Sequence, residues 1–204
     1  MGLLDILTGR RQVKGPAPDR LFAISTAWVD LQTEHNINPA GTAAIVFQAL
    51  ATSEFEATLR EMEDVVKATG SESGTAVGTQ DDSYGYRWMI LRNPEGKPSV
   101  EDLAVGINAV SGSIEAAGHG DRLLCAVFAF TQGSAPSGSG SSGSGRIYFI
   151  YNYKRGYWYP FVPDPGADKQ RLTERELQIK AQIGDELPIE PEIERWFPLW
   201  GIPL

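Results

Sequence analysis

The side chains that could bind a metal or act as an acid or base are few and lie far apart in the sequence. His35 and His119 each occur in a turn-like context, and neither has a second ligand at the spacing of a metal site. Asp81-Asp82 and the acidic segment 61–64 could supply paired carboxylates for acid–base catalysis or for calcium. The first pair is typical of a solvated turn, and the second group fits the polar face of a helix. The sequence therefore predicts no metal site.

The candidate nucleophiles also lack the surroundings that would activate them. Ser25, Ser111 and Ser113 stand outside any Gly-x-Ser-x-Gly motif, which marks the nucleophile of many hydrolases. Cys125, the single cysteine, lies in the apolar run 123–130 and is expected to be a small buried side chain. The Gly/Ser-rich segment 133–145 does not end in the Gly-Lys-Ser/Thr of a phosphate-binding loop. We therefore expect a protein that is not an enzyme and that holds no cofactor.

The charge balance restricts the kind of partner. The chain has 18 basic and 26 acidic residues, so its net charge is −8. A negative charge opposes binding to phosphate backbones, and the sequence has no basic stripe, so we exclude nucleic acid as a partner. A single cysteine, which cannot form an internal disulfide, fits the reducing cytoplasm.

Residues 1–19 are predicted to form a short amphipathic helix followed by a connector. The apolar side chains precede the basic ones, the reverse of a secretory signal, and the apolar part is too short to span a bilayer. As a helix, the segment could rest on the inner face of the membrane through five side chains: Leu3, Leu4, Leu7, Arg10 and Arg11. The alternative is that this helix docks on its own domain, because so short an amphipathic helix binds lipid weakly without a second anchor.

Helices and strands alternate through the rest of the chain. Ser53, Ser99 and Thr173 each precede an acidic residue by three positions, a capping pattern that predicts helix starts. Period-two segments rich in β-branched and aromatic residues predict about six strands. These segments are 27–33, 42–50, 84–92, 123–131, 147–153 and 157–162, and a shorter strand over 75–79 could pair with the strand from residue 84.

These elements predict an α+β fold with a mainly antiparallel sheet and amphipathic helices on one of its faces. The order strand, strand, helix recurs along the chain, although the residues themselves do not repeat. We interpret residues 20–204 as a single domain, since no long polar linker divides them. Within that domain, the Gly/Ser segment 133–145 is expected to be a flexible loop at the tip of a hairpin, either native or introduced.

Two groups of aromatic side chains could form binding surfaces. Near the C-terminus, Trp196, Phe197 and Trp200 could contact a protein partner, or the tail could fold over the core and bury them. A second group could line a pocket between helices and sheet for a small molecule or a substrate, and the alternative is that these rings fill the core. The members of this second group are Trp28, Trp88, Tyr151 and Tyr157.

Four segments together resemble the PspA-associated protein family known as PspAB. They are residues 1–5, 21–29, 148–153 and 195–203, and the last, Arg-Trp-Phe-Pro-Leu-Trp-Gly-Ile-Pro, is the most specific. The resemblance spans nearly the whole chain except the Gly/Ser segment. It implies a cytoplasmic accessory protein associated with PspA, the coiled-coil protein of the phage shock response to envelope stress. It supplies no catalytic residue.

The leading hypothesis is a non-catalytic accessory protein that binds a protein partner, with PspA as the first candidate. One alternative is a peripheral sensor at the membrane surface, acting through residues 2–14. The other is a small-molecule-binding protein or enzyme with a pocket between helices and sheet. The sequence leaves the identity of the partner, the oligomeric state and the strand order open.

Overall fold

The computed structural model of the protein describes residues 18–133 and 145–204. The predicted N-terminal helix, with Leu3, Leu4, Leu7, Arg10 and Arg11, lies outside the described residues. Residues 134–144 of the Gly/Ser segment lie outside them as well, although the strands on either side of that segment pair with each other, as expected for a hairpin.

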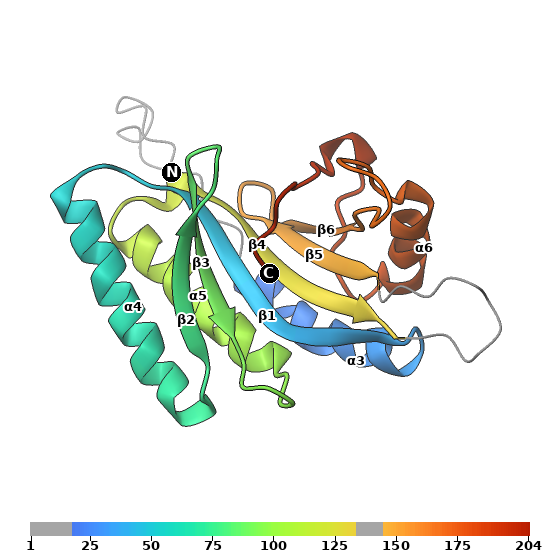
Figure 1. The fold of residues 1–204 in the computed structure, drawn as a ribbon, viewed down its shortest axis with the longest axis horizontal. Helices are drawn as coiled ribbons and strands as arrows, with labels where there is room; N and C mark the ends of the chain where they lie inside the picture. Colours follow the sequence, from blue (N-terminus) through green and yellow to red (C-terminus); the bar gives the residue numbers. More distant parts are fainter. Residues whose placement is uncertain (1–17, 134–144) are drawn as a thin grey trace, which may run out of the picture.

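Six antiparallel strands form one sheet in the order β2-β3-β1-β4-β5-β6 (Figure 1). Their bounds are β1 Ile37–Gln48, β2 Ala76–Asp81, β3 Tyr86–Arg92, β4 Leu123–Gln132, β5 Arg146–Asn152 and β6 Tyr157–Phe161. The long strand β1 lies in the middle and pairs with β3 on one side and β4 on the other. The α+β class is thus confirmed, as are the short strand β2 and five of the six longer strands.

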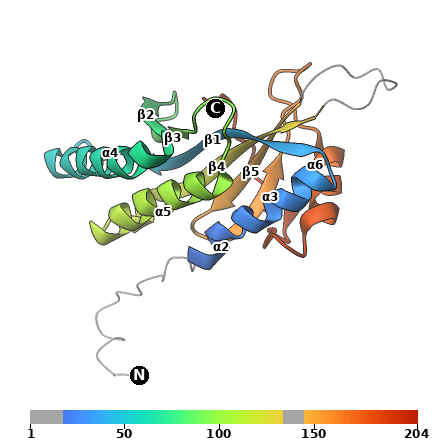
Figure 2. The same cartoon turned by 90° about the horizontal axis from the view of Figure 1, so that it is seen from below.

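The helices cover one face of this sheet, as predicted (Figure 2). Within the described residues they are α2 Pro18–Phe22, α3 Ile24–Thr33, α4 Ser53–Ser73, α5 Val100–Ala116 and α6 Thr173–Ile183. The buried stripe of α5, which includes Leu103 and Ile107, shares one apolar core with Phe128 of β4. This helix approaches β3 closely at Gly106, where an added Cβ would lie 2.3 Å from Leu91 Cδ2.

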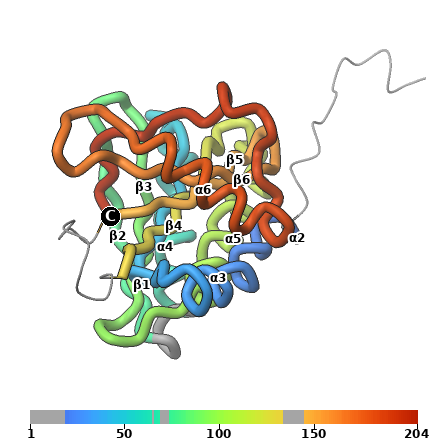
Figure 3. Tube along the Cα trace, turned by 90° about the vertical axis from the view of Figure 1, so that its right-hand side faces the viewer, coloured from blue at the N-terminus to red at the C-terminus, as the bar shows by residue number. Residues whose placement is uncertain are grey.

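The second face of the sheet is covered by the chain that follows α6. In Figure 3 this chain lies on the opposite side of the strands from α3 and α5. Trp196 is buried there, and Leu199, Trp200, Ile202 and Leu204 pack on the same apolar cluster from the outside. The C-terminal run therefore acts as the third layer of the domain.

One predicted strand is wrong, because residues 27–33 belong to the helix α3. Ile24, Ala27 and Leu31 are all buried, and their spacing of three and four residues is that of one helix face. A segment of seven residues is too short to separate this pattern from a period of two, since both place apolar residues at several of the same positions. Burial against α5 and β1 decided the outcome in favour of a helix.

The three predicted helix starts are confirmed, but only one has the predicted cap. The Ser99 side chain accepts a hydrogen bond from the Asp102 N–H at the start of α5. At α4 the capping side chain is Thr52, whose Oγ1 accepts from the Phe55 N–H. At α6 no side chain caps the helix, and Glu176 turns inward and accepts a hydrogen bond from Val162, the residue directly after β6.

Candidate functional site

The four rings predicted to line a pocket do not come together. Cross-strand partners share a face of a sheet, and Tyr151 pairs with Ala126, which places it on the helix side. Trp88 belongs to the apolar cluster of the opposite face. Trp28 lies on α3, and its indole N–H donates a hydrogen bond to Glu101 over 2.8 Å. The Arg20 guanidinium carbon lies over the Tyr157 ring, 4.9 Å from the ring centroid. These rings therefore fill the core or stabilise its margins.

The three C-terminal aromatic residues differ in their exposure. Trp196 is 2% exposed, stacks on Tyr159 and donates its Nε1–H to the Glu190 carbonyl over 3.0 Å. Trp200 is half-buried, and the centroid of its ring lies 5.3 Å from the centroid of the Phe161 ring. Phe197 is 57% exposed. Of the three, Phe197 alone exposes most of its side chain to solvent.

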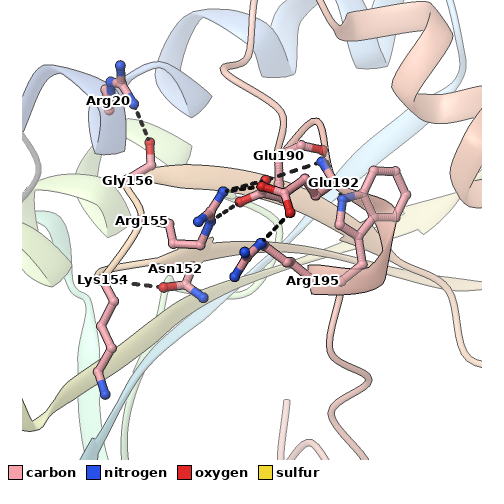
Figure 4. A network of polar contacts seen from close by, with 9 residues as sticks. Arg20, Asn152, Lys154, Arg155, Gly156, Glu190, Glu192 and Arg195 are labelled. Atoms are coloured by element: carbon pink, nitrogen blue, oxygen red, sulfur yellow. Dashed lines mark hydrogen bonds and ion pairs between the residues drawn. The ribbon is translucent and has the colours of Figure 1, made fainter.

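A charged network joins the β5–β6 turn to the segment before Trp196 (Figure 4). Arg155 donates two hydrogen bonds to the buried Glu190 carboxylate, from Nε and Nη2, and a further bond from Nη2 to Glu192 over 3.1 Å. Arg195 donates to the other oxygen of Glu192 over 2.8 Å. Hydrogen bonds from Arg155 hold the pKa of Glu190 below its usual value. This network fastens the C-terminal layer to the sheet.

Arg20 joins α2 to the same turn. Its Nη1 donates to the Gly156 carbonyl over 3.2 Å (Figure 4). The Arg20 carbonyl accepts from Trp158 Nε1 over 2.7 Å. The turn is also stabilised by Asn152, whose side chain accepts from the Lys154 N–H. Gly156 has a φ of +69°, a value that glycine adopts without strain. The β5–β6 hairpin is thus held both by α2 and by the segment that precedes Trp196.

A groove of about 210 Å³ lies between α4 and the edge strand β2. Its walls come from one stripe of α4, from the second half of β2 and from the start of β3: Glu56, Leu59, Arg60, Glu63, Thr79, Gln80, Asp81 and Arg87. Arg87 spans the groove, donating to Asp81 Oδ1 over 2.6 Å and to Glu56 Oε1 over 2.9 Å. The sequence did not predict this groove, because its two walls meet only when α4 packs beside β2.

Electrostatics in this groove are set by Arg87. The hydrogen bonds that it donates hold the pKa of the Asp81 carboxyl below its usual value, and the same bonds to Asp81 and Glu56 raise the pKa of Arg87 itself. Asp82 serves the adjacent turn: its Oδ1 accepts from the Tyr84 and Tyr86 N–H groups and its Oδ2 from Trp88 Nε1. The two carboxylates predicted as a pair therefore have separate roles: Asp81 forms an ion pair with Arg87, and Asp82 accepts hydrogen bonds in the adjacent turn.

The side chains of Cys125 and His119 take part in packing. Burial raises the pKa of the Cys125 thiol to about 12, which leaves very little thiolate at neutral pH. The His119 ring lies edge-on to Phe55 with their centroids 5.1 Å apart. In the parts of the chain that the structure describes, no three His, Cys, Asp or Glu side chains are placed to hold a metal ion.

Comparison with known proteins gives one result. The family model for PspA associated protein B matches residues 1–204, the full length of the chain. The chain belongs to the PspA associated protein B family. No curated protein and no solved structure matches it. Among the residues described, no helix of this PspA associated protein B family member is long and apolar enough to cross a membrane.

Proposed function

We propose that the protein is a cytoplasmic accessory protein of the PspA envelope-stress system and that it acts by binding PspA. Family membership over residues 1–204 is the observation that carries this proposal. The family name records an association with PspA, and direct binding is the simplest form that such an association takes.

The packing of the reactive side chains supports binding over catalysis. The Cys125 thiol is buried with a raised pKa, and His119 is used in an aromatic contact with Phe55. Arg87, Arg155 and Arg171 each hold carboxylates within the fold. These groups stabilise a rigid scaffold whose outer surface is available to a partner.

Co-purification tests the proposal. The tagged full-length chain is captured from native extract, with an unrelated acidic protein of similar net charge as the control bait. We expect PspA to be enriched on the chain and not on the control. Purified PspA then provides the direct measurement, in which complex formation is followed by analytical ultracentrifugation. Capture of no protein of the stress response in extract, together with no complex between the pure proteins, would overturn the proposal.

Two substitutions connect the proposal to the C-terminal aromatic residues. Phe197→Ala removes an exposed ring and is expected to leave the fold intact, since the side chain is 57% exposed. Leu172→Ala removes an apolar side chain of similar exposure, 40%, on the entry to α6 and serves as the matched control. If Phe197 contacts the partner, only the first substitution weakens complex formation.

A further inference from the structure

The two edges of the sheet differ in how their outward backbone groups are satisfied. At the β6 edge, the Trp158 N–H donates to the Pro188 carbonyl over 2.9 Å and the Trp158 carbonyl accepts from the Glu190 N–H over 2.7 Å. Pro160 has no N–H. The Val162 N–H donates to Glu176 over 2.8 Å, and its carbonyl accepts from Leu172. The chain itself thus blocks the β6 edge against another strand.

Within residues 18–133 and 145–204, no segment of the chain protects the β2 edge in this way. The Asp82 N–H donates to the Tyr86 carbonyl, which fixes the hydrogen-bonding pattern of this antiparallel ladder. The backbone groups of even-numbered β2 residues therefore bond to β3, and those of odd-numbered residues point outward, away from the sheet. The outward residues are Val77, Thr79 and Asp81. Among the described residues, no backbone hydrogen bond reaches their outward N–H and carbonyl groups. They form a row of free donors and acceptors along an exposed strand.

Helix α4 lies beneath this free edge. In Figures 1 and 2, α4 extends sideways past β2, the last strand on that side, so the helix layer is wider than the sheet. The groove described above lies at this step, with Leu59 in its wall and Arg87 across it. A strand added beside β2 would therefore have its lower face covered by α4 instead of by water alone.

Charge indicates the kind of strand that fits. Residues 53–68 and 76–88, which form the described part of α4 and most of the β2–β3 hairpin, contain seven carboxylates and three cations. Such an excess of negative charge attracts basic segments and repels acidic ones. It also disfavours pairing between the β2 edges of two copies of this chain, because that arrangement brings two such acidic regions together.

We propose that the β2 edge and α4 bind an extended basic segment of a partner protein by strand addition. The inference rests on the proposed function in that it names the surface at which a partner is held. The N–H and carbonyl groups of Val77, Thr79 and Asp81 bind the backbone of the segment, and the carboxylates of α4 bind its lysine and arginine side chains. Main-chain hydrogen bonds supply affinity in this mode, and the side chains supply selectivity.

A synthetic peptide tests the proposal on the full chain. The probe is an acetylated octapeptide of alternating lysine and threonine, and its control is the same peptide with every backbone amide methylated on nitrogen. The methylated peptide keeps its charge and loses the donors that a β-ladder requires. We expect the unmodified peptide to bind with a dissociation constant below about 1 mM and to slow amide exchange at Val77, Thr79 and Asp81. Equal binding by both peptides, or no binding of the unmodified one, overturns strand addition.

Thr79→Pro is the matching change in the protein. It removes one outward N–H while leaving the ladder donors of Gly78 and Gln80 in place, and proline is tolerated on edge strands. Thr79→Val, which keeps the N–H, is the control. We expect Thr79→Pro to weaken peptide binding about tenfold and Thr79→Val to change it less than twofold. A concentration-dependent dimer of the unmodified chain that Thr79→Pro abolishes would show instead that a second copy occupies the edge.

The outcomes separate this inference from the proposed function. If the Thr79→Pro chain captures PspA as well as the original chain does, PspA binding stands and the β2 edge is not its surface. If the unmodified peptide binds at β2 while neither chain captures PspA, the edge is a binding site and the proposed function fails.

Discussion

Arg171 and Glu176 form an ion pair in which the carboxylate is completely buried. The Arg171 Nε donates to both Glu176 oxygens, over 3.0 and 2.8 Å, and its Nη1 donates to the Trp196 carbonyl over 2.6 Å. Glu176 also accepts from the Val162 N–H. This one pair therefore connects the end of β6, the start of α6 and the C-terminal layer.

Removing the cation from this pair is expected to destabilise the fold strongly. Arg171→Met leaves the Glu176 carboxylate buried and unpaired, a change that typically costs about 3–5 kcal/mol of unfolding free energy. Urea unfolding at pH 7 measures it. Adding Glu176→Gln to the Arg171→Met chain removes the unpaired charge and keeps an acceptor for Val162, so part of the loss is expected to be recovered. A loss below about 1 kcal/mol for Arg171→Met would contradict the buried pair.

The Glu190 carboxylate should make stability depend on pH in one direction. Its pKa is held below the usual 4.5 by hydrogen bonds from Arg155, so the folded state binds the proton more weakly than the unfolded state does. The stabilisation is then fully present above about pH 4.5 and is lost as the pH falls through the lower folded-state value.

Glu190→Gln measures that contribution. At pH 7 it is expected to reduce the unfolding free energy by about 1–2 kcal/mol, and the difference from the original chain should shrink below pH 4.5. Glu194→Gln, at an exposed position of the same segment, is the control and should have little effect. A difference that stays constant from pH 7 to pH 3 would speak against the ion pair with Arg155.

Cys125 should be inert in the folded protein. Its side chain is buried in the apolar cluster on the second face of the sheet, and burial raises its pKa to about 12. We expect Ellman's reagent at pH 8 to modify the thiol only as fast as the protein unfolds, and to modify it at once in guanidinium chloride. Rapid labelling of the native protein would show that the C-terminal layer opens readily.

Two glycines of α5 provide a matched test of its packing. Alanine stabilises a helix relative to glycine by about 0.5–1 kcal/mol, and at Gly112 the added Cβ meets nothing within 4 Å. At Gly106 the Cβ would collide with the buried Leu91 side chain of β3. We expect Gly112→Ala to raise the melting temperature and Gly106→Ala to be about 1–3 kcal/mol less stable than Gly112→Ala. Equal effects would mean that α5 and β3 are less tightly packed than the structure indicates.

Sequence patterns determined most of the elements, because periods of two and of about 3.6 residues are local properties of the chain. The strands predicted over 147–153 and 157–162, the strand beginning near residue 123 and the Ser99 cap were all visible in this way. The same reasoning failed for residues 27–33, where a short segment fitted both periods and burial of Leu31 settled the matter. It also assigned Glu176 to a helix cap, although the carboxylate accepts a hydrogen bond from Val162, the residue directly after β6.

Only the tertiary structure decided which side chains that are distant in the sequence come into contact. The placement of Trp88 and Tyr151 on opposite faces follows from strand register, and the burial of Trp196 follows from the path of the tail over the second face. The free edge of β2 beside α4 depends on strand order, which is set by pairings between distant segments. Sequence periodicity specifies which face of an element is apolar, and the partner of that face is chosen by long-range packing that no local pattern encodes.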